Sequence, residues 1–207
     1  MSDRSESPLI LTVPGLDGSG PRHWQSQWEK WDEHTVRVDL GEWQQPHRNS
    51  WVNRLNLAIE RAARPVVLAA HSLGCLAVAW WVAYERPVWG SKVLGALLVA
   101  PPDVDAAVFE PRLLPFAPTP LTTLPFPSIL AASRDDPYAS LDRSRRLAAF
   151  WGSRFADLGA LGHVNAESGI GAWPGGRRLI DRLIGTAHQD YGPKPMGSPM
   201  IEYALTN

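Results

Sequence analysis

Two segments constrain the fold of this chain more than any other feature, because every position in them is apolar or glycine. They are VVLAA at 66–70 and LGALLVA at 94–100. A strand with one face in water alternates apolar and polar residues, whereas a parallel strand covered on both faces is apolar throughout. The two segments therefore predict the centre of a parallel sheet that lies between two layers of helices.

Periodicity along the rest of the chain extends this prediction. The candidate strands are 9–13, 35–40, 65–70, 93–100, 128–132 and 154–158, and the candidate helices are 23–31, 49–63, 73–84, 141–151 and 173–184. This alternation predicts an α/β fold, a three-layer sandwich with a mostly parallel sheet of about six strands. Reactive groups in such folds gather beyond the carboxyl ends of the strands.

The domain organisation follows from length and from two irregular segments. One domain is expected over residues 1–186, and an irregular C-terminal extension over 187–207, where periodicity is lost and Gly and Pro recur. The segment 101–127 carries eight prolines. It predicts a loop over the carboxyl edge of the sheet, too short and too rich in proline for a separate lid or cap domain.

Composition excludes several classes of partner. Twenty Lys and Arg against 21 Asp and Glu give a net charge of −1, which provides no positive field for nucleic acid or an anionic membrane. The longest apolar run, 93–102, is far below the ~20 residues that span a bilayer. The lone Cys75 and the polar N-terminus favour the cytoplasm. Both a monomer and a homodimer remain open.

Ten tryptophans are an unusual number for a chain of 207 residues. Trp24, Trp28 and Trp31 recur at i, i+4 and i+7, which places them on one face of a helix. Burial of this face against the sheet explains their spacing without an aromatic binding platform.

The segment VVLAAHSLGCLAVAWW at 66–81 carries the strongest chemical signal, because it predicts a strand, a tight turn at Ser72 and a helix. Hydrolases hold a nucleophilic serine in such a turn, with small residues two positions before and after it. Ala70 and Gly74 occupy these positions, although glycine is usual at both. A serine in this place can also be a simple helix N-cap.

A nucleophilic serine needs a base, and the base needs an orienting acid. His163 follows the last candidate strand, as the chain order Ser, acid, His of this fold requires. His71 adjoins the serine but is interpreted as a packing residue. Asp135 and Asp136 both follow the preceding strand, and Pro137 favours an extended backbone at Asp136.

Two backbone N–H groups are expected to stabilise the oxyanion of an acyl-transfer reaction. Leu73 follows the nucleophile, and Leu16 lies in the glycine-rich turn VPGLDGSG after the first strand. The turn matches neither GxGxxG nor a Walker A sequence, so a nucleotide-binding site is not expected. No cofactor or metal is predicted.

Five segments resemble one known group of proteins. LTVPGLDGSGPRHWQSQWE, VVLAAHSLGCLAVAWW, LLVAPPDV, ASRDDPYAS and LGHVNAESGIGAWPGG are similar to segments of the small serine hydrolases grouped with YdeN and retinoblastoma-binding protein nine. The resemblance implies an α/β-hydrolase core without a cap domain and a triad of Ser72, Asp136 and His163. It favours Asp136 over Asp135, because DPY matches the acid motif of the family.

The resulting expectation is a carboxylesterase-like enzyme that cleaves a small ester through an acyl-serine intermediate. The alternative is an interaction module that keeps the fold without catalysis.

Overall fold

The structure is a computed structural model, and it describes residues 7–106 and 110–190. Its strands are β1 (Leu9–Val13), β2 (Thr35–Arg37), β3 (Val66–His71), β4 (Val93–Val99), β5 (Ser128–Ala132) and β6 (Arg154–Asp157). Its α-helices are α1 (Trp24–Trp31), α2 (Arg48–Arg61), α3 (Leu73–Glu85), α4 (Leu141–Trp151) and α5 (Pro174–Asp190). Two short 3₁₀ helices are η1 (Pro111–Phe116) and η2 (Ala166–Ser168).

The six described strands form one sheet in the order β2-β1-β3-β4-β5-β6, and every neighbouring pair is parallel. The prediction of a mostly parallel sheet is confirmed, with no antiparallel strand in the described part of the chain. All six strands end at the same edge of the sheet. The connections after β1, β3, β5 and β6 therefore meet there.

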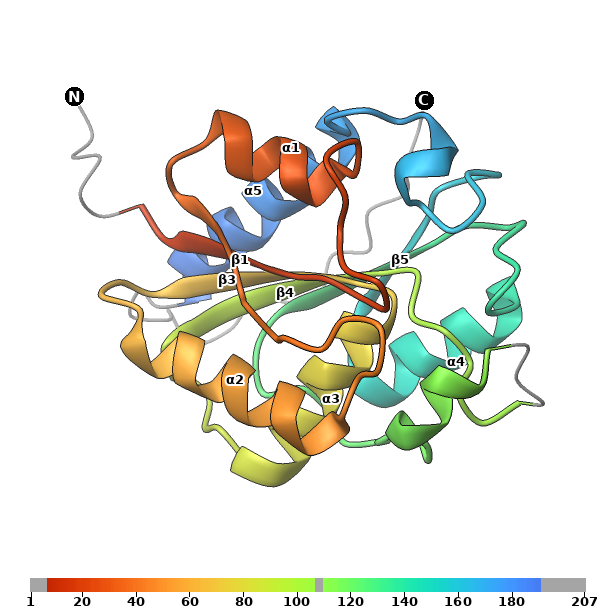
Figure 1. The fold of residues 1–207 in the computed structure, drawn as a ribbon. Coiled ribbons are helices and arrows are strands. Elements are labelled where there is room, and N and C mark those ends of the chain that lie inside the picture. Colours follow the sequence, from red (N-terminus) through yellow and green to blue (C-terminus); the bar gives the residue numbers. More distant parts are fainter. Residues whose placement is uncertain (1–6, 107–109, 191–207) are drawn as a thin grey trace.

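Side chains of the central strands explain why helices cover both faces. Val66, Leu68 and Ala70 of β3 pack into one apolar cluster with α2, α3 and α4. Val67 and Ala69, which point the other way, pack with α1 and α5. Figure 1 shows α1 and α5 on one side of the sheet and α2 and α3 on the other. The three-layer sandwich is confirmed.

Three local predictions differ from the structure. β2 ends at Arg37 rather than at residue 40, although Val38 still donates its N–H to Thr12 O (2.9 Å), because the chain leaves the sheet towards a left-handed turn at Gly41. Trp24 and Trp28 are buried, but Trp31 is 74% exposed. It is the last residue of α1, so no later turn continues the covered face.

The third difference concerns the C-terminal boundary. α5 continues to Asp190, so residues 187–190 are helical where an irregular extension was expected. The helical apolar pattern had appeared to end near residue 184. Residues 191–207 of the expected extension lie outside the described residues.

The proline-rich segment 101–127 packs against the core instead of forming a separate unit. Its described part contains η1 as its only helix, and Phe116, Leu124 and Phe126 are buried in the cluster formed with α3 and α4. No cap domain is present among the described residues. The segment lies on the α3–α4 side of the fold, near the carboxyl edge of the sheet (Figure 1).

Candidate active site

Ser72 lies in a strained turn between β3 and α3. Its φ of 52° and ψ of −125° are a conformation that residues with a side chain rarely adopt. Gly74 is required for the turn, because a Cβ there would lie 2.2 Å from Val13 O, at the end of β1. The close approach of helix and strand therefore leaves Ser72 at the carboxyl edge, in the arrangement of a nucleophile elbow.

The three side chains proposed as the triad form a continuous chain of hydrogen bonds. Ser72 Oγ lies 2.8 Å from His163 Nε2, and His163 Nδ1 lies 2.9 and 3.0 Å from the two carboxylate oxygens of Asp136. This pattern fits a neutral imidazole that donates Nδ1–H to the carboxylate and accepts the serine proton at Nε2. The Asp136 side chain is 3% exposed and that of His163 10%.

Asp135 has different partners from Asp136. Its Oδ1 accepts the hydroxyl of Ser133 at 2.6 Å and the N–H of Gly162 at 2.8 Å. These two donors lower the pKa of the Asp135 carboxyl below its usual value. Of the two aspartates left open by spacing, Asp136 thus bonds the imidazole and Asp135 bonds the backbone of the loop that carries it.

The predicted oxyanion donors lie on two segments in contact beside Ser72. A Cβ on Gly15 would lie 2.8 Å from Ser72 Cβ and 3.1 Å from Leu73 N. Leu16 follows Gly15, and Leu73 is the first residue of α3, so its N–H has no acceptor within the helix. Neither N–H bonds a backbone carbonyl among the described residues. The roles of Leu16 and Leu73 stay a prediction.

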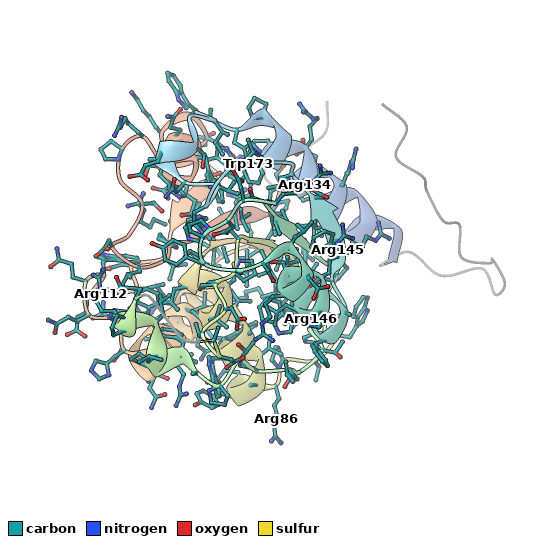
Figure 2. The ribbon with its side chains drawn as sticks, turned by 90° about the vertical axis from the view of Figure 1, so that its right-hand side faces the viewer. Arg86, Arg112, Arg134, Arg145, Arg146 and Trp173 are labelled. Carbon is teal, nitrogen blue, oxygen red and sulfur yellow. The ribbon has the colours of Figure 1, made fainter. Side chains whose placement is uncertain are left out.

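Residues from two other segments hold the turn that carries Leu16. Asp17 donates its N–H to Trp43 O at 2.8 Å, and its carboxylate accepts from Arg112 at 2.9 Å. Arg112, labelled in Figure 2, belongs to the proline-rich segment, so its bond to Asp17 ties that segment to this turn, and Glu110 of the same segment accepts a second bond from Arg112 at 2.7 Å. Beside the turn lies an open cavity of about 600 Å³. It is lined by Asp17, Glu42, Trp43, Gln44, Gln45 and His47.

His71 contacts the loop of His163 rather than the serine. Its Nε2–H donates to the backbone carbonyl of His163 at 2.8 Å, and burial, together with nearby His23 and His163, holds its pKa well below the usual value. His23 packs against it, with ring centroids 4.6 Å apart. Burial, reinforced by Arg37, lowers the pKa of His23 to about 4.

Tyr138 is a neighbour of the site that sequence reasoning did not single out. Its ring centroid lies 4.5 Å from that of His163, and its backbone N–H donates to Asp136 at 2.9 Å. The residue is 40% exposed. The DPY motif was the only sequence signal that pointed to it.

Residues 7–106 and 110–190 contain no group of three or more His, Cys, Asp or Glu arranged to bind a metal ion. None of the helices in these ranges is both long and apolar enough to cross a membrane.

Solved structures of similar fold cover most of this chain. A YdeN-like hydrolase from Pectobacterium atrosepticum is 31% identical, with a TM-score of 0.77 over 88% of this chain and 94% of that one. The ydeN gene product of Bacillus subtilis (19% identity, TM-score 0.67, 86% and 100% coverage) and a carboxylesterase of Bacillus cereus (18%, 0.56, 89% and 90%) share the fold. No curated protein matches the chain.

A family model described as serine hydrolase matches residues 10–182, which include β1 through most of α5. This range contains Ser72, Asp136 and His163. It also covers every segment on which the resemblance to YdeN rested, and that resemblance is confirmed. The chain therefore belongs to the serine hydrolase family and is a YdeN-like member of it.

Proposed function

We propose that this protein hydrolyses carboxylic esters through an acyl-Ser72 intermediate, with His163 as general base and Asp136 as the orienting acid. The observation that carries the proposal is the hydrogen-bonded chain from Ser72 Oγ through both ring nitrogens of His163 to Asp136. A serine hydroxyl is a weak nucleophile until an oriented base removes its proton. The chain of bonds supplies both the base and its orientation.

The steps follow from these positions. Ser72 Oγ attacks the ester carbonyl carbon as His163 Nε2 takes its proton, and the resulting oxyanion is stabilised by the N–H groups of Leu16 and Leu73. The imidazolium then protonates the leaving alkoxide as the carbon–oxygen bond breaks. Water, deprotonated by His163, attacks the acyl-serine; the acyl–oxygen bond to Ser72 then breaks, the imidazolium returns the proton to Ser72 Oγ, and the carboxylic acid leaves.

The cavity beside the Asp17 turn supports a small, polar substrate. Its lining includes carboxylate, amide and imidazole groups, with Trp43 as its large apolar side chain. We infer that the cavity receives the part of the ester next to the oxyanion donors, because Asp17 directly follows Leu16. Short acyl chains should therefore be preferred over long ones.

Steady-state kinetics with p-nitrophenyl esters of increasing acyl length test this function. Ser72→Ala and His163→Ala should each remove nearly all turnover, and the double variant should be scarcely worse, because triad members act as one unit. Circular dichroism verifies that each variant is folded. Full activity in folded Ser72→Ala would exclude Ser72 as nucleophile. Absence of turnover in the folded wild type across the panel would favour the interaction module.

A further inference from the structure

The backbone of the turn that carries His163 is hydrogen-bonded at every residue to side chains from other parts of the chain. In each of four consecutive residues, 161–164, one backbone group bonds a side chain of another element. In chain order the bonds are Leu161 N–H to Ser133 Oγ (2.8 Å), Gly162 N–H to Asp135 Oδ1 (2.8 Å), His163 O from His71 Nε2–H (2.8 Å) and Val164 O from Trp24 Nε1–H (3.0 Å). The catalytic chemistry proposed above uses none of these four partners.

The backbone of this turn needs such support. Gly162 and Val164 have φ values of 55° and 50°, and a β-branched residue such as Val164 rarely adopts a left-handed conformation. Strained conformations persist only where surrounding contacts hold them. Freed from these bonds, the turn would relax and displace the imidazole, because within residues 7–106 and 110–190 the His163 side chain itself is held only by Asp136, Ser72 and ring contacts.

We propose that Asp135 and His71 are positioning residues, which hold the turn 161–164 so that His163 Nε2 stays within hydrogen-bond distance of Ser72 Oγ. This inference rests on the proposed function. Asp135 acts from the loop after β5, and His71 acts from the last position of β3. Neither side chain hydrogen-bonds Ser72 or the Asp136 carboxylate.

The two positions need opposite hydrogen-bonding groups, a donor at His71 and an acceptor at Asp135, and this difference determines which substitutions test each residue. His71 must donate a hydrogen bond from Nε2–H while the imidazole is neutral, and its burial favours the neutral form. Glutamine places an amide N–H2 near this point and does not titrate, whereas leucine offers no donor. Asp135 must accept a hydrogen bond from the Gly162 N–H, which asparagine can do through its side-chain carbonyl and alanine cannot.

The kinetic test compares donor-retaining with donor-lacking variants. His71→Leu and Asp135→Ala should each lower kcat by roughly 10- to 100-fold with KM within about twofold of wild type, since small misplacements of a catalytic group cost this much. His71→Gln and Asp135→Asn should recover at least a third of wild-type kcat. A purely structural role would give equal losses in the paired variants, in proportion to their loss of thermal stability.

Asp157→Ala is the matched control for Asp135. Asp157, the last residue of the neighbouring strand β6, also accepts a backbone N–H, that of Gly159, at 3.0 Å, but it makes no hydrogen bond to residues 161–164. Its loss should leave kcat within about twofold. A fall in kcat equal to that of Asp135→Ala would contradict the positioning role of Asp135.

A readout independent of turnover separates this inference from the proposed function. Proton NMR should show a downfield Nδ1–H signal from His163 bonded to Asp136, assigned by its loss in His163→Ala. The signal should weaken or shift in His71→Leu and Asp135→Ala and persist in the conservative pair. If the wild type lacks turnover but the signal responds in this way, positioning stands and esterase function fails. If turnover is present and neither variant changes kcat or the signal, positioning is wrong.

Discussion

Asp136 and Asp135 are adjacent in sequence but have different hydrogen-bond partners in the site. Asp136→Asn keeps the shape of the side chain but favours the wrong tautomer of His163, so kcat should fall by about 10⁴. Asp135→Asn keeps an acceptor for Gly162 N–H and should cost less than about threefold. Steady-state kinetics of the two purified variants measure both effects. The reverse ranking would transfer the orienting role to Asp135.

His23 makes the stability of the protein depend on pH. Its Nδ1 accepts Gln25 N–H at the start of α1, while burial lowers its pKa from 6.5 to about 4. The unfolded chain therefore binds the extra proton first as pH falls. Stability from this residue is complete above pH 6.5 and is lost as pH falls towards 4, by up to about 3 kcal/mol.

The variant His23→Asn tests this dependence, because asparagine keeps a cap acceptor and does not titrate. Urea unfolding between pH 4 and 7.5 should show that the variant gains free energy of unfolding relative to wild type as pH falls. If the free energy of unfolding changed with pH in the same way in both proteins, the pKa of His23 would not differ between the folded and unfolded chain.

Individual site residues could be predicted from the sequence where a motif fixes the local backbone, but not where their contacts join distant parts of the chain. The strand–Ser–helix pattern placed Ser72 in its turn, and Pro137 favoured the aspartate that bonds His163. The bond from His71 to the carbonyl of His163 joins residues 92 positions apart, and no local pattern encodes it. Tyr138 was missed for the same reason.

At the scale of elements, α5 is fixed to α1 by an aromatic cluster. Trp173, labelled in Figure 2, packs against Trp24 and Trp28 with ring centroids 5.2 and 6.3 Å away. Gly176, in the first turn of α5, leaves room for the Trp173 ring, since a Cβ there would lie 2.2 Å from it. Trp24 also donates to Val164 O, so the cluster extends to the turn of His163.

Two glycine substitutions in the same helix should have opposite effects. Gly176→Ala forces the Trp173 ring to move and should cost about 1–3 kcal/mol. Gly185→Ala meets no atom within 4 Å and should stabilise the helix by about 0.5–1 kcal/mol. Thermal unfolding should show a Tm fall for the first and a rise of about 2–4 °C for the second. A stabilising Gly176→Ala would disprove the tight packing of Trp173.

Element boundaries were less predictable than element types. The apolar residues Val38 and Leu40 alternate with polar ones, so the sequence predicted a β2 that reaches residue 40. Both residues are indeed buried, but they lie beyond the end of the strand. Helical spacing placed Trp31 on the covered face but could not show that α1 ends there. The reach of α5 to Asp190 depends on polar residues whose pattern carries no helical signal.

At the scale of the whole molecule, one parallel sheet gathers the site from four distant segments. The connections after β1, β3, β5 and β6 carry Leu16, Ser72, Asp136 and His163, respectively, to the same edge. Uniformly apolar strands and chain order predicted this convergence, since parallel strands end together. The distances between the side chains could not be predicted, because they depend on the loops and on bonds such as those that hold residues 161–164.

In the proposed mechanism, the imidazole of His163 activates Ser72 as the nucleophile. The most direct measurement is mass-spectrometric mapping of the protein after reaction with a fluorophosphonate probe. We expect one adduct on the peptide that contains Ser72, formed rapidly in wild type, absent in Ser72→Ala and strongly slowed in His163→Ala. A folded wild type that does not react, or an adduct on another serine that persists in Ser72→Ala, would contradict this mechanism.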